Sequence, residues 1–410
     1  MNNNYLLRNN VNSGNKFDKY LIILIISLGM GDIASPLLLS RILAILFLPS
    51  MLMHVNKCGY VATTKRIFIL LLIYSLFSLV WTYNFSEGCK AIVYNVIHFT
   101  IYFEILVFCR FANNPLESIS KGWTFVVFFL SVFAVWEILT GHHLSLARET
   151  DQTINLGGVM TNRILATTTF SNYNSFVTLL CFAMPWLFYR LSIVSKYKVN
   201  SLVLVLTLIL ASLVIFIDGS RGGLFSVIVI IGVYICFSPK GTSTLVTSCL
   251  FLGALLFILM RYGEQIFVVL TMKSEGQGLT SDSSRIEIWK ACLIALLNSF
   301  GLGAGIGGIK GSIESVSTNI INVPHNMVIE VLLEYGVVFG ILFIGFILRL
   351  LRKGSKLHDK NRRMAVLMAI LALPFYGIIN SLYLKSPETF VLFATLFVFV
   401  YYERVKPICK

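Results

Sequence analysis

The sequence predicts an all-α polytopic membrane protein with about twelve transmembrane helices. Three observations support this class: an apolar composition, apolar runs of spanning length, and an uneven distribution of positive charge. Of the 410 residues, 57% are hydrophobic and only 13% are charged, whereas soluble domains carry about 45–50% apolar and about 25% charged residues. The composition therefore excludes a soluble globular domain, a disordered chain and a coiled coil.

Apolar runs long enough to cross a hydrocarbon core of roughly 30 Å occur throughout the chain. Asp32 and Pro36 interrupt the first of them, which we interpret as a kinked span followed by a complete one. The twelve expected spans lie near 20–36, 37–54, 67–83, 91–109, 122–141, 174–194, 201–217, 222–237, 243–260, 326–348, 364–383 and 387–402.

The positive charge follows the orientation of these spans. With alternate connections assigned to opposite sides, 22 of the 33 Lys and Arg residues lie on the side of the two termini. Short cytoplasmic loops hold such an excess, so both termini are expected in the cytoplasm. The formal net charge of +14 is thus explained by topology, and no nucleic-acid partner is expected.

We expect residues 1–410 to form a single integral membrane domain with two long periplasmic connections, 142–173 and 261–325. The second lies between spans 9 and 10. Within it, residues 284–298 place apolar side chains at helical spacing, and Ser284 with Glu287 resembles a capping box. The sequence predicts an amphipathic helix on the outer membrane face here; the alternative is a short span that dips into the bilayer.

Three short motifs on the outer side carry candidate chemistry, and each is expected at a helix N-terminus. Ser220 can cap the eighth span with Arg221 in its first turn, Arg285 lies in the first turn of the amphipathic helix, and His325-Asn326 opens the tenth span. Free N–H groups and guanidinium groups at helix N-termini bind phosphate oxygens. These positions therefore suit a diphosphate.

His325 has two interpretations. Taken alone, it reads as a hydrogen-bonded histidine at a helix interface. Its coincidence with two arginines favours a neutral imidazole that acts as general base toward a hydroxyl nucleophile. No Cys/His spacing typical of a zinc site and no Asp-rich metal motif accompanies it on the outer side.

The motifs resemble those of the O-antigen ligase and O-antigen polymerase superfamily. HNMVIEVLLEYGVVFG, from His325 to Gly340, resembles the family's pattern of His-Asn, nine residues and Gly. Arg285 with Trp289 and the glycine-rich run after Gly301 resemble the stretch that precedes the family's histidine. DGSRGG at 218–223 and TFSNYNSF at 169–176 resemble further family segments.

One departure bears on the kind of enzyme. The ligase pattern continues from Gly336 with two residues and then Gly, Thr or Tyr, but Phe339 stands there and the glycine follows at Gly340. This favours a repeat-unit polymerase over a ligase.

The resemblance implies an inverting glycosyl transfer without cofactor or metal, at the periplasmic face of the bacterial inner membrane. His325 would activate the acceptor hydroxyl, and Arg221 and Arg285 would bind the donor diphosphate, with Arg163 as a further candidate ligand. Asn326 would orient the histidine or cap the helix.

Two acidic residues of the tenth span, Glu330 and Glu334, are expected either to hold the acceptor or to pair structurally with Arg41 or another partner.

The implied partners are a glycan on undecaprenyl diphosphate, an acceptor glycan (a lipid-linked repeat unit or lipid A core), membrane lipids and a chain-length regulator. A lipid-linked oligosaccharide flippase is a further alternative, although a transporter is expected to show two related halves. The G-x-G-x-x-G at Gly303, Gly305 and Gly308 follows a helix instead of a strand, so we interpret it as a flexible turn and not as a dinucleotide site.

Overall fold

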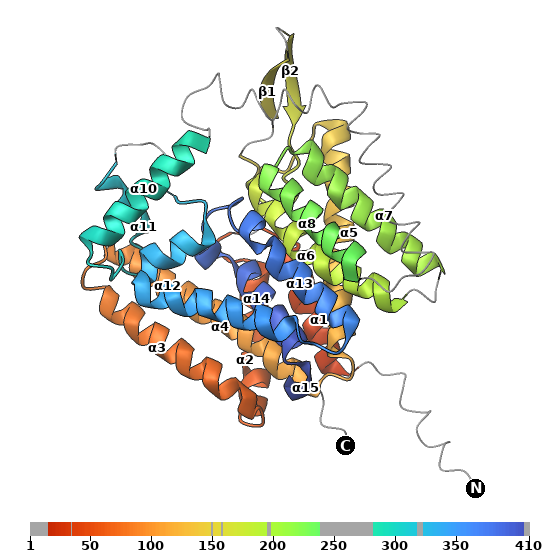
Figure 1. Cartoon of the computed structure of the whole chain (residues 1–410), viewed down its shortest axis with the longest axis horizontal. Helices are drawn as coiled ribbons and strands as arrows, with labels where there is room; N and C mark the ends of the chain where they lie inside the picture. The colour runs from red at the N-terminus through yellow and green to blue at the C-terminus, as the bar shows by residue number, and fades with distance from the viewer. Residues whose placement is uncertain are drawn as a thin grey trace.

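The computed structural model describes residues 15–33, 35–148, 151–156, 159–194, 198–237, 282–317 and 323–405. Over these residues the chain is a bundle of helices with one β-hairpin projecting from one end (Figure 1). The first half contains α1 (Lys16–Leu28), α2 (Leu39–Val55), η1 (Gly59–Val61), α3 (Ala62–Ser78), α4 (Phe85–Phe111), α5 (Pro115–Thr140), β1 (Asp151–Leu156), β2 (Val159–Ile164) and α6 (Tyr173–Val194). The second half contains α7 (Lys198–Ile217), α8 (Arg221–Phe237), α10 (Asp282–Asn298), α11 (Ile309–Glu314), α12 (Met327–Gly354), α13 (Lys360–Tyr376), η2 (Tyr383–Lys385), α14 (Pro387–Val400) and α15 (Tyr402–Val405).

Local sequence signals explain where several helices begin. The side chain of Asn84 accepts a hydrogen bond from the Glu87 amide at the start of α4, and Asp359 does the same for Asn361 and Arg362 at the start of α13. Such side chains satisfy N–H groups that have no partner within the helix. Pro115 opens α5, where its missing N–H carries no cost.

Among the described residues, six helical stretches are long and apolar enough to cross a membrane: Gly59–Ser78, Phe85–Phe111, Pro115–Thr140, Tyr173–Val194, Val199–Ile217 and Met327–Gly354. Three shorter helices, α2, α8 and α14, are also apolar. These findings support a helical multi-pass membrane protein, whereas the number of twelve spans stays a prediction. The expected span at 243–260 lies outside the described residues.

The core lies around α6, which packs against α5, α7, α8 and α13. Its Trp186 is fully buried, as is Trp123 of α5. By contrast, α3 lies at the edge of the bundle (Figure 1), and apolar side chains such as Leu70 and Phe77 are 60% and 67% exposed. An apolar exposed face of this size is what contact with lipid requires.

Both described ends of the chain lie at the same end of the bundle. Asn15 donates a side-chain hydrogen bond to the carbonyl oxygen of Phe111 at the end of α4, and Arg110 donates to the carbonyl oxygen of Arg404 at 3.3 Å. The β-hairpin projects from the opposite end (Figure 1). This arrangement agrees with termini on one side of the membrane, and their assignment to the cytoplasm stays a prediction.

The structure refines two details of the prediction. The all-α class holds for the bundle, and the connection 142–173 adds a short antiparallel hairpin of β1 and β2, with Asp151 opposite Ile164. The alternation of β-branched and polar residues in TINL and VMTNRI is typical of strands. The strands were not predicted because the connections were defined only as the segments between apolar spans. In addition, α10 begins at Asp282, so Ser284 lies within its first turn and is not the N-cap.

Candidate functional site

The three predicted motifs meet the same short segment, Phe375–Ile379 at the end of α13. Gly222 of α8 approaches it so closely that a Cβ there would lie 2.8 Å from both the Phe375 carbonyl oxygen and Ile379 Cγ1. Arg285 of α10 donates from Nη1 to the Ile378 carbonyl oxygen at 3.1 Å. His325 has a backbone hydrogen bond at Ile379. The segment therefore brings together three elements whose contacting residues, from Gly222 to His325, span more than 100 positions of the sequence.

The N-terminus of α8 is built as predicted. Gly219 turns the chain with a φ of +59°, a conformation that glycine adopts without a steric penalty. Ser220 then accepts a hydrogen bond from the Gly223 amide at 3.3 Å, as an N-cap does. Arg221 is the first residue of the helix and is half-buried. Arg221 thus lies in the first turn, at the positive end of the α8 dipole.

Residues 324–327 are held between α10 and α13. The indole Nε1 of Trp289 donates to the Pro324 carbonyl oxygen at 2.8 Å. On the other side the Met327 amide donates to the Gly377 carbonyl oxygen at 2.9 Å. Trp289 belongs to the motif that suggested the family, but its contact with Pro324 was not foreseen, because nothing in the local sequence links α10 to the turn before α12.

Asn326 is the N-cap of α12. Its side-chain oxygen accepts hydrogen bonds from the amides of Val328 at 3.0 Å and Ile329 at 3.2 Å. Of the two expected roles, capping the helix is confirmed. The cap fixes the start of α12 directly beside His325.

His325 combines strain, burial and an available nitrogen. Its φ of +47° lies in the left-handed region, which is uncommon for residues other than glycine and is often found at functional sites. Its Nδ1 is buried and has no hydrogen-bond partner among the described residues. Burial and, second, the charge of Arg285 lower the pKa of His325 from 6.5 to about 4, while the backbone hydrogen bond at Ile379 acts in the opposite direction. The imidazole is consequently neutral at pH 7 and can accept a proton.

The two acidic residues of α12 accept hydrogen bonds from backbone amides of neighbouring loops. Glu330 accepts hydrogen bonds from the amide of Leu382 at 2.7 Å and from that of Leu384 at 3.4 Å. Glu334 accepts one from the Gly307 amide at 3.1 Å. Both carboxylates are buried and are thereby engaged with loops that flank α12.

The partners of these acids are backbone amides and not Arg41, so the structural alternative holds with another partner. Arg41 donates to the carbonyl oxygens of Pro36 at 2.8 Å and Lys385 at 3.0 Å, and to His98 Nε2 at 3.2 Å. Its guanidinium group also stacks 4.0 Å from the ring centre of Tyr94. Arg41 and Glu330 therefore both hold the segment 382–385. Arg41 binds the carbonyl oxygen of its last residue, and Glu330 binds amides of the residues before it.

The glycine-rich run is a packed wedge, which corrects its interpretation as a flexible turn. Gly303 has a φ of +87°, and a Cβ there would lie 2.7 Å from the Gly336 amide nitrogen. Gly336 is where α12 departs from helical geometry, with φ 79° and ψ 177°. The Ala304 amide donates to the Leu333 carbonyl oxygen at 2.6 Å, in place of the intrahelical bond that is broken there. The family's glycine at 336 thus permits a close backbone approach.

Arg163 lies in β2 opposite Gln152. The placement of its side chain lies outside the described part of the chain, so its role as a diphosphate ligand stays a prediction. Among the described residues there is no group of three or more His, Cys, Asp or Glu side chains that could hold a metal ion. His143 is part of a different arrangement, described below.

Comparisons with known proteins address the resemblance independently. Residues 206–344 match the family model described as O-antigen ligase. An alignment over 275 residues, which covers 64% of the chain, is 24% identical to the teichuronic acid biosynthesis protein TuaE of Bacillus subtilis (strain 168) and covers 55% of that protein. The match spans about half the length of that relative. Both comparisons support the resemblance to the O-antigen ligase and polymerase superfamily that the motifs indicated.

Proposed function

We propose that the chain is a surface-polysaccharide repeat-unit polymerase that works at the periplasmic face of the bacterial inner membrane. Its donor is a glycan on undecaprenyl diphosphate and its acceptor is a hydroxyl group of a second lipid-linked glycan. The observation that carries the proposal is the meeting of the α8 N-terminus, Arg285 and His325 at the segment Phe375–Ile379.

The chemistry assigned to this site is a displacement at the anomeric carbon. The neutral imidazole of His325 takes the proton of the acceptor hydroxyl as the new C–O bond forms from the face opposite the diphosphate. The old bond breaks with its electron pair on the diphosphate oxygen, and the configuration inverts. Arg221 and Arg285 stabilise the leaving charge, with the α8 N-terminus adding its N–H groups.

The site places an acid-base group and cations at different helices, which supports this division of roles. Arg285 is anchored through one guanidinium nitrogen to a backbone carbonyl at 3.1 Å. A carbonyl-anchored guanidinium keeps its orientation and retains further N–H groups for a ligand. The same charge lowers the pKa of His325, so Arg285 is assigned both to donor binding and to keeping the base unprotonated.

A ligase that transfers the glycan to lipid A core is the second candidate, favoured by the description of the matching family model. Phe339, the departure from the ligase pattern, packs against Tyr74 with ring centres 4.9 Å apart and against Tyr335 at 6.2 Å. A flippase is the third alternative, and a general base would be superfluous for it because it transfers no glycan.

Reconstitution of the purified chain with a lipid-diphosphate-linked oligosaccharide tests the proposal. We expect products with additional repeat units on the lipid diphosphate, and loss of these products in Arg221→Ala and Arg285→Ala through a raised KM for the donor. Transfer only to added lipid A core would establish the ligase instead. Translocation without any glycan transfer would establish the flippase.

A deletion strain provides the cellular counterpart. Loss of a polymerase leaves a single repeat unit on its final acceptor, whereas loss of a ligase leaves long chains on undecaprenyl diphosphate. The length distribution of the lipid-linked and acceptor-linked glycans separates the two outcomes.

A further inference from the structure

A buried stretch of non-helical backbone, residues 165–171, lies inside the helical bundle between β2 and α6. Ala166, Thr167 and Thr168 are fully buried, and Thr168 has a φ of +53°. Backbone N–H groups buried away from water need partners, and in a membrane protein irregular backbone persists only where protein supplies them. The stretch has no helix or sheet ladder of its own to do so.

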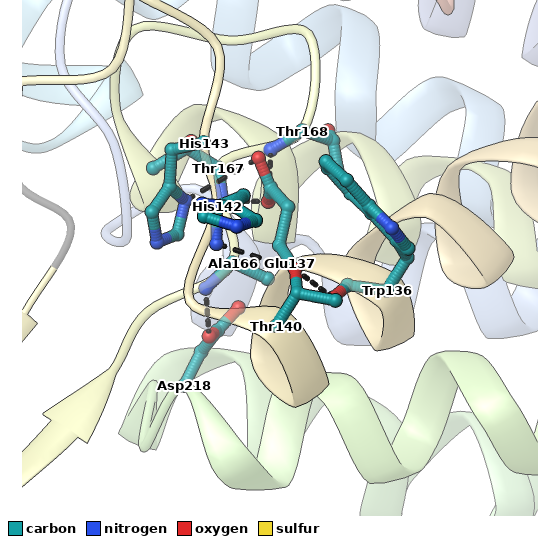
Figure 2. Close-up of polar contacts among 9 residues, drawn as sticks. All are labelled: Trp136, Glu137, Thr140, His142, His143, Ala166, Thr167, Thr168 and Asp218. Atoms are coloured by element: carbon teal, nitrogen blue, oxygen red, sulfur yellow. Dashed lines mark hydrogen bonds and ion pairs between the residues drawn. The ribbon is translucent and has the colours of Figure 1, made fainter.

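Carboxylates from separate helix ends supply these partners (Figure 2). Glu137, in the last turn of α5, accepts hydrogen bonds on Oε2 from the amides of Thr167 at 2.9 Å and Thr168 at 2.8 Å. Asp218, directly after α7, accepts one on Oδ1 from the Ala166 amide at 2.8 Å. We call Glu137 and Asp218 the carboxylate clamp.

The clamp is an expensive way to hold a loop. Both carboxylates are fully buried, and a buried charge is costly unless hydrogen bonds and counter-charges offset it. His143 Nδ1 lies 3.3 Å from the other carboxylate oxygen of Glu137, Oε1 (Figure 2). The hydrogen bonds from the backbone amides to Glu137 and Asp218 are charge-assisted. Charge-assisted hydrogen bonds are shorter and stronger than neutral ones, so the clamp fixes the backbone more firmly than neutral side chains would.

The clamp connects the chain segment that bears Arg221 of the proposed donor site with the segment that bears Arg163, the further candidate ligand. Ala166 follows Arg163 of β2 by three residues, and Asp218 precedes Arg221 of α8 by three residues. The hydrogen bond from the Ala166 amide to Asp218 therefore fixes the base of the hairpin beside the turn that starts α8. Gly219 and Ser220 complete that turn, so a shift at Asp218 is transmitted to Arg221.

We propose that Glu137 and Asp218 are positioning residues for binding of the lipid-diphosphate donor, because they fix the hairpin base and the α8 N-terminus relative to each other. The inference rests on the proposed function, since it assigns the arginines of these segments to the donor. Neither residue of the clamp touches the reacting atoms; each acts through the backbone that it holds.

Asp32 offers a matched control. It accepts hydrogen bonds from the amide and hydroxyl of Ser171 at 2.8 and 2.6 Å. It thus holds the same stretch at its other end, but it follows α1 and has no link to the start of α8.

The test compares Glu137→Gln, Asp218→Asn and Asp32→Asn in the full-length protein in lipid vesicles, with kcat and the donor KM measured separately. Each amide keeps an acceptor oxygen and the side-chain shape while it removes the charge. For the clamp variants we expect the donor KM to rise about tenfold, the effect of about 1.4 kcal/mol from a weakened charge-assisted bond, with kcat within about threefold of wild type. Asp32→Asn is expected to keep the wild-type KM.

Hydrogen exchange of the 165–171 amides, followed by mass spectrometry, shows whether the clamp has been loosened. Faster exchange in the clamp variants together with a raised KM supports the proposal. Faster exchange with an unchanged KM overturns it, because the clamp is then structural only. Loss of rate in proportion to loss of folded protein, at constant KM, overturns it as well.

The Arg221→Ala variant keeps this outcome separate from the fate of the proposed function. If Arg221→Ala leaves the donor KM unchanged, the donor assignment itself is wrong. If Arg221→Ala raises the KM and the clamp variants do not, only the positioning role of Glu137 and Asp218 is refuted.

Discussion

Under the proposed function, the environment of His325 determines the pH dependence of transfer. Its pKa falls to about 4 because the imidazole is buried beside Arg285. An ordinary histidine has a pKa of about 6.5 and would be about 90% protonated at pH 5.5, whereas a histidine with a pKa of about 4 stays about 97% neutral there. The two cases differ about tenfold in the fraction of enzyme that carries a competent base.

The sign follows from which form is active. A lowered pKa retains the neutral base as the pH falls below 6.5, and activity is lost only as the pH falls through about 4. The measurement is kcat/KM for the lipid-diphosphate donor, which reports ionisations of the free enzyme, between pH 4.5 and 8 in vesicles with the site facing the medium. We expect less than a twofold fall between pH 7 and 5.

A half-maximal kcat/KM near pH 6.5 would refute this reasoning, because His325 would then titrate as in water. The variant Arg285→Gln provides a second check. Removal of the positive charge raises the pKa of His325, so the acid limb moves to higher pH, but by the smaller part of the total shift because burial is its first cause. The rate is compared at saturating donor, since the same variant weakens donor binding.

Three further substitutions test the framework of the site. Asn326→Ala removes the cap of α12 and is expected to lower the free energy of unfolding by about 1 kcal/mol, with Asn326→Asp close to wild type, as measured by thermal unfolding in detergent. Gly303→Ala is expected to lower the free energy of unfolding by about 2 kcal/mol or more, since its φ is +87° and a Cβ would lie 2.7 Å from the Gly336 amide nitrogen. The control Gly345→Ala, where a Cβ meets nothing within 4 Å, should be neutral or slightly stabilising. Equal effects of the two substitutions would contradict the close packing of Gly303 against Gly336. Trp289→Phe loses the hydrogen bond to the Pro324 carbonyl oxygen and should lower kcat with less effect on the donor KM; an unchanged kcat would show that this contact does not position His325.

Much of the fold could be predicted because hydrophobicity over long windows is a strong signal. Apolar runs indicated the helices, and Ser220 and Asn326 marked two helix starts that the structure confirms. The helix start at Ser284 was missed by two residues, since the acidic and polar residues before it also tolerate a helix. The hairpin was missed because its strands are six residues long and lie in a connection between apolar spans.

The individual site motifs were also accessible from the sequence, but their support was not. Arg221, Arg285 and His325 were recognised by residue type and expected helix position. The segment Phe375–Ile379, which contacts all three motifs, could not be predicted from the sequence. It contributes backbone carbonyls and apolar side chains, which form no recognisable motif. The roles of Glu137 and Glu330 could not be predicted either, since each binds backbone amides of a loop that is distant in sequence.

The measurement that tests the account most directly is transfer by His325→Ala in lipid vesicles, together with binding of the lipid-diphosphate donor. A general base contributes roughly a hundredfold to ten-thousandfold to the rate. We therefore expect kcat to fall at least about a hundredfold while the donor binds within about threefold of wild type, because Arg221 and Arg285 remain. Product formation within a few-fold of wild type by correctly folded His325→Ala would contradict the assignment of His325 as the base.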